Sequence, residues 1–408
     1  MRVMVTFGHR FLRTSNGHIY TRGTVDYSFL SRYLAVFDEV VVLSRVEDVD
    51  EIQPDKNRTD GPNVSIFPLP YYFGPMQFFK RYREVKAAVK RAVDAADAYI
   101  LRVSGHEGTM LWHHLRKKGI PYGVEVVTDP WDVLAPGSVK TILRPFLRRK
   151  MTRDLVRQCR YASVAAYVTE YSLQKRYPPG CWSTHYSTID LPADAILDES
   201  VVNRRTERIA AKLDAGEPLR LCFVGGMSQL YKAPDILISS AADCIKNGVN
   251  LELVMVGDGE LRPQLEEQAE TLGAAEKIHF LGSLPPGQAV YEQLDQADLF
   301  VLPSRQEGLP RAVIEAMARG MPCISSTVGG VAELIGHEYL VPPGNIEALS
   351  KKIKEVVSDK EALHQMSHRN LKKSHKYCID ILNERRKEFY QKLAEITQAW
   401  RLKTGGHK

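Results

Sequence analysis

The sequence predicts an α/β protein made of two doubly wound, Rossmann-like domains that face each other across a cleft. The chain has 408 residues, which is too long for one hydrophobic core. Strand-like and helix-like segments alternate through both halves, as in parallel sheets with helices on both faces. Because the stretch from Leu191 to Pro218 is polar and lacks a strand pattern, we expect an N-terminal domain over 1–192, a linker over 193–218 and a C-terminal domain over 219–380.

The N-terminal half carries strand-like segments separated by helical patterns. The expected strands are VMVTFG from Val3, EVVVLSRV from Glu39, AYILRVS from Ala98, YGVEVV from Tyr122 and SVAAYVT from Ser163. Helical spacing of apolar residues occurs in VDYSFLSRYLAVF from Val25 and in FFKRYREVKAAVKRAVDAADA from Phe78.

The C-terminal half repeats this plan more regularly. The expected strands are LRLCFVGG from Leu219, LELVMVGDG from Leu251, KIHFLG from Lys277, LFVLPS from Leu299, PCISS from Pro322 and YLVPP from Tyr339. Helices are expected from Pro234, Leu261, Ala289, Pro310 and Asn345. Ligands of such folds bind outside the carboxyl ends of the strands, which places the site in the cleft between the domains.

The composition is that of an ordinary soluble protein, with 44% hydrophobic and 25% charged residues. No apolar run is long enough for a membrane span, and the N-terminus reads as a first strand, so we expect a cytoplasmic protein. The six cysteines are scattered without metal-ligand spacing, so we expect no metal and no disulfide frame. The net charge of +6 is modest, and we expect no nucleic-acid partner.

A basic stretch in the N-terminal half, Lys140 to Arg160, holds eight basic residues and the single acid Asp154 beside an apolar stripe. Such a segment can rest on an anionic membrane, which would make the protein peripheral at the inner face of the membrane. The alternative is a solvated helix face above an ordinary core stripe.

Glycine-rich loops follow the strands of the C-terminal half. Gly225 and Gly226 follow the first strand with Lys232 beyond them, and Gly257, Asp258 and Gly259 follow the second. Glycines allow a phosphate to approach backbone amides, and a lysine neutralises its charge. These loops belong to one edge of one sheet, so we expect them to form one site.

A third loop at that edge, PSRQEGLPRAVIEAMARG from Pro303, places Glu307 before a helix and Glu315 inside it. The free amides near Gly308 form an anion-favouring helix start. The alternative is purely local, with Glu307 as a helix cap and Glu315 paired with Arg311.

These motifs resemble the donor domain of the family-4 glycosyltransferases, which are retaining group 1 enzymes of the GT-B type. The VGG…K loop, VMVGDGELRPQLE, IHFLGSLP, ADLFVLPSRQEGLPRAVIEAMARGMPCISSTVGGVAELI and YLVPPGN occur in the family's order over 219–359. The resemblance implies transfer of a sugar from a UDP- or GDP-sugar to a glycan or lipid-linked acceptor, in polysaccharide or glycoconjugate biosynthesis.

The resemblance also implies the roles of individual residues. Glu307 lies beside the donor sugar and Glu315 holds the ribose hydroxyls. Lys232 matches the phosphate-binding lysine, so Glu307 and Lys232 are the catalytic candidates. The segment Gly308, Leu309 and Pro310 contacts sugar and diphosphate, with the Leu309 amide as donor and no amide on Pro310.

One position departs from the family pattern. The usual arginine after the first glycine is replaced by Gly226, and the loop SQLYK is one residue longer. The diphosphate is therefore expected to be bound by Lys232 and backbone amides alone, or with help from another cation such as Arg262.

The resemblance further implies retention of configuration without a metal or other cofactor, the departing phosphate taking the acceptor proton. The sequence contains no convincing D-x-D, because DPWD from Asp129 has the wrong spacing. Two carboxylates also suggest a glycosidase, which the ribose role of Glu315 argues against. A nucleotide-sugar epimerase and a non-catalytic nucleotide-sugar-binding subunit are the alternatives.

The N-terminal domain is expected to bind the acceptor. Gly17 or Gly23, in the loop SNGHIYTRG, would let that loop approach the donor diphosphate. Asp129 or Glu125, after the strand YGVEVV, would face the acceptor hydroxyl.

The last segment, residues 381–400, has apolar residues at helical spacing, namely Phe389, Leu393, Ile396 and Trp400. GT-B enzymes typically end in a helix that returns to the N-terminal domain, so we expect this helix to complete that domain. A coiled-coil or dimer helix is the alternative.

Overall fold

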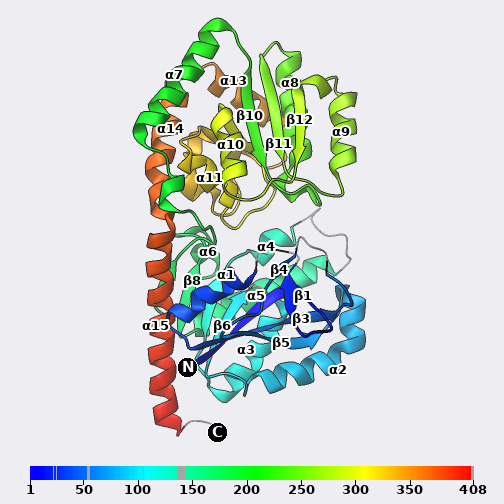
Figure 1. Cartoon of the computed structure of the whole chain (residues 1–408), viewed down its shortest axis with the longest axis vertical. Helices are drawn as coiled ribbons and strands as arrows, with labels where there is room; N and C mark the ends of the chain where they lie inside the picture. The colour runs from blue at the N-terminus through cyan, green and yellow to red at the C-terminus, as the bar shows by residue number, and fades with distance from the viewer. Residues whose placement is uncertain (22, 24, 53–55, 104, 136–142, 406–408) are drawn as a thin grey trace. The chain divides into compact units, whose positions relative to one another are not determined.

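The structure is a computed structural model that describes residues 1–21, 23, 25–52, 56–103, 105–135 and 143–405. It divides into two compact units (Figure 1). Unit 1 comprises Met1–Tyr186 and Asn383–Lys408, and unit 2 comprises Ser187–Leu382. Each unit is an α/β domain built on a parallel sheet, so the predicted fold class of two Rossmann-like domains is confirmed.

A parallel sheet forms the centre of unit 1, with the strand order β5-β3-β1-β6-β7-β8-β9. Its middle strands are buried on both faces, as their continuous apolar runs require. These strands are β1 (Arg2–Arg13), β3 (Glu39–Asp48), β5 (Val64–Pro70), β6 (Ala98–Val103), β7 (Gly123–Val126), β8 (Val164–Tyr167) and β9 (Ser183–His185).

Several strands of unit 1 were not predicted. Strands β2 (Ile19–Thr21) and β4 (Asn57–Arg58) are short and antiparallel, and they extend the far end of β1. Strand β5 contains Pro68 and Pro70, which normally argue against a strand. It tolerates them because it lies at the edge of the sheet, where β3 is its one partner strand in the described part of the chain.

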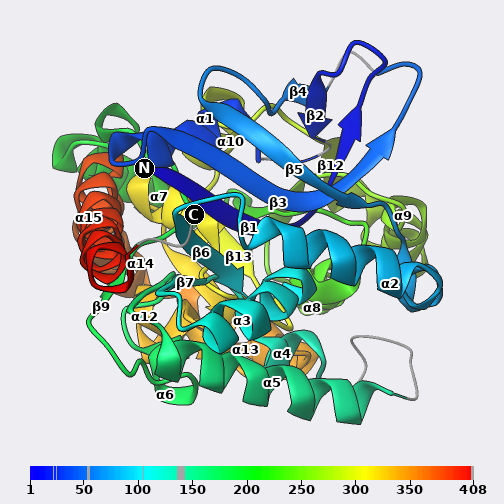
Figure 2. The ribbon, with the colours of Figure 1, turned by 90° about the horizontal axis from the view of Figure 1, so that it is seen from below.

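Helices α2, α3 and α5 lie side by side in one layer of unit 1 (Figure 2). Each packs an apolar stripe inward and leaves its charged face outside, as amphipathic helices on a sheet do. The α-helices of unit 1 before residue 187 are α1 (Tyr27–Ser31), α2 (Gly74–Ala92), α3 (His106–Lys118), α4 (Pro130–Val133), α5 (Arg144–Tyr161) and α6 (Ser172–Arg176).

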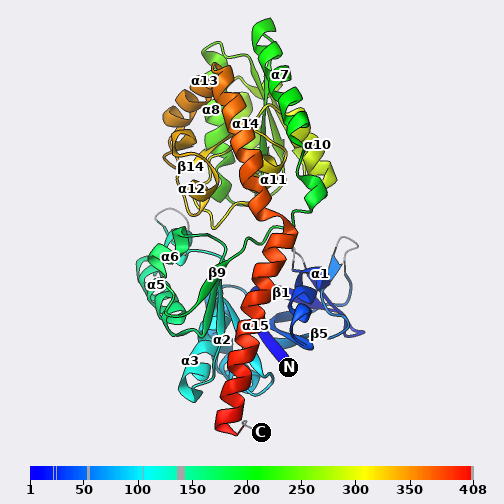
Figure 3. The same ribbon diagram turned by 90° about the vertical axis from the view of Figure 1, so that its left-hand side faces the viewer.

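The last helix, α15 (Ile379–Thr404), runs along unit 1 from residue 383 onward (Figure 3). Phe389 and Leu393 are fully buried against β7, where a Cβ on Gly123 would lie 2.8 Å from the Phe389 ring. Ile396, which the sequence placed in the same stripe, is exposed, and Thr397 is buried instead. The buried residues of this stripe, at 389, 393 and 397, are therefore spaced four residues apart along the helix.

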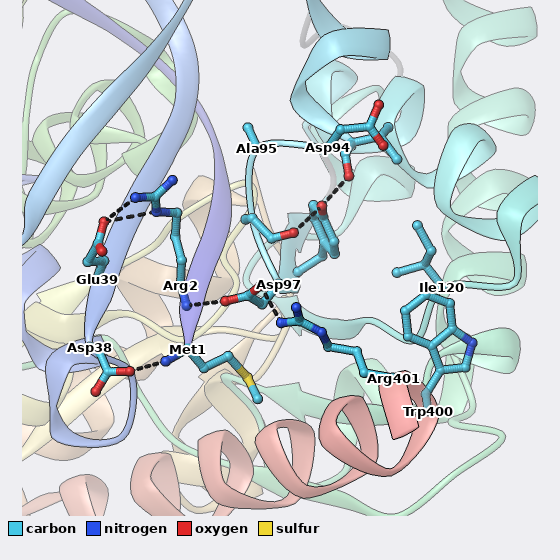
Figure 4. Close-up of a pocket in the computed structure, with 13 residues that line it drawn as sticks. Met1, Arg2, Asp38, Glu39, Asp94, Ala95, Asp97, Ile120, Trp400 and Arg401 are labelled. Carbon is cyan, nitrogen blue, oxygen red and sulfur yellow. Dashed lines mark hydrogen bonds and ion pairs between the residues drawn. The ribbon is translucent and has the colours of Figure 1, made fainter. Parts of the chain in front are cut away.

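The end of α15 is attached to the amino ends of the strands of unit 1 (Figure 4). Arg401 forms an ion pair with Asp97, whose other oxygen accepts the backbone amide of Arg2 at 2.8 Å. Trp400 and Arg401 border a hollow of about 360 Å³ there. This hollow lies at the sheet edge opposite the carboxyl ends, so it is separate from the edge where ligands of this fold bind.

Tyr390 of α15 provides a test of the buried polar network in unit 1. Its ring packs 4.9 Å from that of Tyr33 between centroids, but its buried hydroxyl has no partner among the described residues. We expect Tyr390→Phe to raise the free energy of unfolding by about 1 kcal/mol, because it removes the desolvation cost of that hydroxyl. Urea unfolding curves measure the change.

The matched control is Tyr33→Phe. This change removes a hydrogen bond of 2.9 Å to the buried carboxylate of Glu125, so it should lower the free energy of unfolding by about 2 kcal/mol. Equal losses in both variants would show that the Tyr390 hydroxyl is bonded in solution.

Unit 2 is built on a parallel sheet with the strand order β12-β11-β10-β13-β14-β15 in the described residues. This order reverses between β10 and β13, which is the arrangement of dinucleotide-binding folds. The strands are β10 (Leu219–Val224), β11 (Leu251–Val256), β12 (Ile278–Gly282), β13 (Leu299–Leu302), β14 (Cys323–Ser326) and β15 (Leu340–Val341). The helices are α7 (Glu199–Ala215), α8 (Pro234–Lys246), α9 (Arg262–Thr271), α10 (Gln288–Gln296), α11 (Arg311–Ala318), α12 (Val331–Leu334), α13 (Ile346–Val357) and α14 (Lys360–Ser374).

The segment 193–218, expected to be a linker, is instead part of unit 2. Helix α7 occupies most of it and packs on α14, with Val202 and Ile209 buried two turns apart. Arg205 is also buried, where it donates to the carbonyls of Leu294 and Ala297 at 3.0 Å. The prediction was wrong because the many polar residues of this segment are typical of a linker. In the fold these polar residues have partners, and the segment forms an amphipathic helix.

Candidate active site

The candidate site of unit 2 lies at the carboxyl edge of its sheet. Loops 225–233, 257–261, 303–310 and 327–330 follow strands β10, β11, β13 and β14 in turn. The strand order reverses between β10 and β13, so the loops after these two strands leave in opposite directions. Ligands of open α/β sheets bind at this point.

Lys232 and Glu307 form the centre of the site. The Lys232 Nζ lies 2.6 Å from the Glu307 Oε1, and the two side chains are only 14% and 8% exposed. The Ser304 hydroxyl donates to the same oxygen at 2.7 Å. The other oxygen, Oε2, accepts no hydrogen bond from the described residues. Glu307 is thus held through one oxygen, and the other can accept a hydroxyl from a ligand.

The glycines of the first two loops allow close backbone contact between them. Gly257 has a φ of +135°, and a Cβ there would lie 2.0 Å from the carbonyl oxygen of Gly225. A Cβ on Gly259 would lie 2.1 Å from the Ser228 amide nitrogen. The carboxylate of Asp258 accepts the Gly259 amide at 2.7 Å, so its observed role is to shape the turn.

Arg305 joins the loop after β13 to the turn that carries Lys232. Its guanidinium makes a bidentate pair with Asp235 at 2.7 and 2.6 Å. It also donates to the Leu230 carbonyl at 2.7 Å, and its own amide donates to the Tyr231 carbonyl at 2.7 Å. Because bidentate arginine pairs fix orientation as well as distance, this clamp holds Lys232 in reach of Glu307.

The start of helix α11 presents free backbone amides at the site. Those of Gly308, Leu309 and Arg311 donate to no backbone acceptor in the described residues, and Pro310 has no amide to donate. Gly329 of the next loop supports this segment, because a Cβ there would lie 1.9 Å from the Glu307 carbonyl oxygen. Free amides at a helix start attract anions.

Glu315 lies one turn inside α11 and is half-buried. Burial raises the pKa of its carboxyl, and the nearby Arg311 partly offsets that effect. Burial and the charge of Glu315 also raise the pKa of Tyr291, which places the phenol near the carboxylate. No described residue donates a hydrogen bond to the carboxylate of Glu315, which leaves both of its oxygens able to accept ligand hydroxyls.

The position of the missing arginine, Gly226, is open in the structure. No heavy atom lies within 4 Å of a Cβ built there, and its φ is outside the left-handed region. Arg262, the alternative cation, donates to Glu266 at 2.7 Å and to the Phe280 carbonyl at 3.3 Å. Its guanidinium is thus already engaged by neighbouring groups.

Two acceptor candidates in unit 1 have structural partners. Asp129 is buried, caps α4 by accepting the Trp131 amide at 2.8 Å, and pairs with Arg176 and the Tyr177 hydroxyl. Neither of its oxygens is free to bind an acceptor in this state.

Glu125 is equally engaged. Its carboxylate is buried and accepts Arg102 at 2.8 Å, the Tyr33 hydroxyl at 2.9 Å and the Tyr186 hydroxyl at 2.7 Å. The sequence places both acids at a strand end but does not show that their neighbours occupy them.

The two glycine candidates differ in position. Gly17 has a φ of +83° in the hairpin between β1 and β2, where its amide donates to the Thr14 carbonyl at 2.9 Å. It serves the turn. Gly23 borders a hollow of about 290 Å³ with His9 and Arg10 among its lining. Gly23 thus lies at a cavity of unit 1.

The basic stretch 140–160 forms α5 from Arg144, and its residues 140–142 lie outside the described ranges. Leu155 and Cys159 are buried, and Leu147 and Met151 are partly covered. The later part of the apolar stripe thus faces the core. Leu143 and Phe146 at its start remain exposed.

Sequence reasoning missed Ser304, Arg305, Asp235 and Gly329. Each holds another residue of the site in place, and residues with such a supporting role show no recognisable pattern in the local sequence. The signal that could have indicated Ser304, Arg305 and Asp235 was their position, because these three lie in or next to loops that were already singled out.

Comparison with known proteins gives three findings. Residues 205–373 match the family described as glycosyl transferases group 1. Protein CapJ of Staphylococcus aureus is 24% identical over 383 residues, which cover 93% of this chain and 92% of that protein. The Vi polysaccharide biosynthesis protein VipC/TviE of Salmonella typhi is 38% identical over 112 residues, 27% of this chain and 19% of that protein.

The fold is shared with a solved structure. The HepE protein of Anabaena, in a complex with UDP and glucose, superposes with a TM-score of 0.63 at 16% identity. The match covers 95% of this chain and 98% of that one.

Proposed function

Because this chain is a glycosyltransferase of group 1, we propose that it transfers a sugar from a UDP-sugar to a glycan or lipid-linked acceptor in polysaccharide biosynthesis. The observation that carries the proposal is the Lys232–Glu307 pair of 2.6 Å, which lies next to the free amides of α11. The solved HepE structure with UDP and glucose supports a uridine donor, and the Vi polysaccharide relative supports the pathway class.

In the proposed donor complex, the charged side chains of Lys232 and Glu315 bind different parts of the nucleotide. An ammonium group has three N–H donors, and one of those on Lys232 points to Glu307. The remaining donors are directed to a diphosphate oxygen, together with the amides of Gly308 and Leu309. Glu315 accepts the ribose hydroxyls, and burial strengthens those bonds because water competes less.

The transfer proceeds with retention of configuration and without a metal cofactor. The bond between the anomeric carbon and the diphosphate oxygen breaks, while the acceptor oxygen bonds to that carbon from the same face. The acceptor proton passes to the departing diphosphate. Lys232 and the α11 amides stabilise the negative charge that develops on the leaving group. The carboxylate of Glu307 stabilises the positive charge on the sugar.

The test is to incubate the full chain with UDP-glucose, UDP-N-acetylglucosamine and GDP-mannose. Binding is measured by calorimetry, and released nucleoside diphosphate is measured with and without a lipid-linked or free sugar acceptor. The proposal expects acceptor-dependent release of UDP. Epimerised sugar without release would favour an epimerase, and binding without turnover would favour a non-catalytic subunit.

The open position at Gly226 gives a gain-of-function prediction. We expect Gly226→Arg to tighten UDP binding by about tenfold, because it adds a cation where a side chain fits. Gly226→Ala is the matched control and should leave the affinity unchanged. Calorimetry with UDP measures both, and weaker binding by the arginine variant would place the diphosphate away from this loop.

A further inference from the structure

Helix α2 exposes a group of large apolar side chains near its N-terminus. Phe73, Met76, Phe79 and Tyr82 are 61%, 74%, 68% and 42% exposed. They lie within ten residues, whereas the opposite face of the helix buries its small and branched residues from residue 85 onward. Exposed apolar residues are common singly, but a cluster of this kind marks an interaction surface.

Cations surround this cluster. Residues 73–92 contain six basic residues and one acid, Glu84, so their net charge is +5. Glu84 is occupied by Arg81 at 2.8 Å. Lys80, Arg83 and Lys86 are exposed on the same helix. The partner of this surface is therefore expected to be apolar and anionic together.

Local contacts hold the apolar cluster in place on the surface. The guanidinium of Arg10 lies 4.8 Å above the Phe73 ring, and the Phe73 amide donates to Gln77 Oε1 at 2.7 Å. The neighbouring Phe78 packs on His106 of α3, with ring centroids 4.4 Å apart. The exposed side chains therefore extend from a helix start that these contacts hold in place.

The cluster also lies at the carboxyl edge of the sheet of unit 1. Helix α2 begins four residues after Pro70, the last residue of β5, so its first turns are at that edge. Figure 2 shows α2 at the side of the layer that it forms with α3 and α5. A ligand bound at the strand ends of unit 1 would thus be close to this surface.

We propose that the N-terminal half of α2, residues 73–86, docks on the headgroup region of a bilayer that contains anionic phospholipid. The aromatic rings and Met76 enter the interface between headgroups and acyl chains, while the basic side chains bind the phosphates. No helix in the described ranges could itself cross a bilayer. The inference rests on the proposed function only in that a lipid-linked acceptor would be presented by the same membrane.

A second copy of the chain fits this surface less well. In a symmetric contact the same patch faces itself, so the basic residues of both copies would be brought together. Like charges in an interface are costly. The acidic surface of a bilayer has the opposite sign and needs no matching shape.

The experiment is co-sedimentation of the full chain with vesicles of phosphatidylcholine alone and of an equal mixture with phosphatidylglycerol. Met76→Ser/Phe79→Ser removes apolar surface, and Lys80→Glu/Arg83→Glu reverses charge. The matched controls are Leu272→Ser/Leu402→Ser, at residues 45% and 80% exposed, and Lys372→Glu/Lys376→Glu. Circular dichroism and UDP affinity, which the proposed function predicts to be unchanged, show that each variant is folded.

We expect the unaltered protein to bind the mixed vesicles and not the neutral ones, with binding weakened by salt. The apolar variant should bind about tenfold more weakly and the charge variant about 30-fold more weakly, with no change in the controls. The inference is overturned if the unaltered protein does not bind the mixed vesicles, or if both variants bind them as tightly as the unaltered protein does. A dimer that the apolar variant converts to a monomer also overturns it. None of these results depends on whether UDP binds, so the two proposals fail separately.

Discussion

Glu307→Gln is expected to lower kcat by about 100-fold or more while the donor Kd changes by less than about threefold. The amide has nearly the same shape as the carboxylate and can still accept the Ser304 hydroxyl, which lies 2.7 Å from Oε1. What the substitution removes is a negative charge in a site where the side chain is only 8% exposed. That charge is needed most when the sugar becomes positive in the transition state. Steady-state kinetics and calorimetry with UDP-sugar measure the two quantities.

The contrasting variant is Glu315→Gln, in the helix α11 that follows the Glu307 loop, because Glu315 is assigned to the ribose. It should weaken donor binding and leave kcat at saturating donor nearly unchanged. Parallel losses of kcat and affinity in Glu307→Gln would instead assign Glu307 to holding the start of α11. A stable fold in both variants is checked by thermal unfolding.

Lys232→Ala is expected to weaken UDP binding by about tenfold to 150-fold, which corresponds to about 1.5–3 kcal/mol for a charge-assisted hydrogen bond. The loss has two causes. The variant lacks the ammonium group that binds the diphosphate, and it leaves Glu307 without the cation that lies 2.6 Å away. An unpaired carboxylate would then repel the diphosphate. Titration calorimetry with UDP measures the effect, and its dependence on salt should also decrease.

Lys246→Ala is the matched control for this change, because Lys246 is exposed at the end of α8 in the same unit. It should leave the affinity for UDP unaltered. If Lys232→Ala bound UDP as tightly as the parent, the diphosphate would not lie between β10 and β13, and the assignment of the whole site would be wrong.

The sequence by itself predicted most of unit 2, because its strands are continuous apolar runs that end in glycine or proline. Runs such as LELVMV and LFVL have few alternatives to a buried strand, and β11 and β13 lie there. It predicted less of unit 1. The strand β5 was hidden by Pro68 and Pro70, and helix α7 of unit 2 was hidden by its polar residues.

The sequence predicted that the loops form one site, but it did not show which residues of the loops contact one another. Lys232 and Glu307 are 75 residues apart, and they meet because β10 and β13 are neighbours in the sheet. Strand order depends on which edges pair in space, which local patterns do not encode. The Arg305–Asp235 clamp was missed for the same reason.

The tertiary structure likewise determines which side chains are buried. Asp129 lies just after β7 and Glu125 lies near its end, but arginines and tyrosines from distant segments already bind both acids. The helices α2 and α5 both carry apolar residues at helical spacing, yet Leu155 of α5 is buried whereas Met76 and Phe79 of α2 are exposed. The local periodicity of the chain determines which residues share a face. Whether that face meets protein or solvent depends on the elements packed around it, so only the tertiary structure decides it.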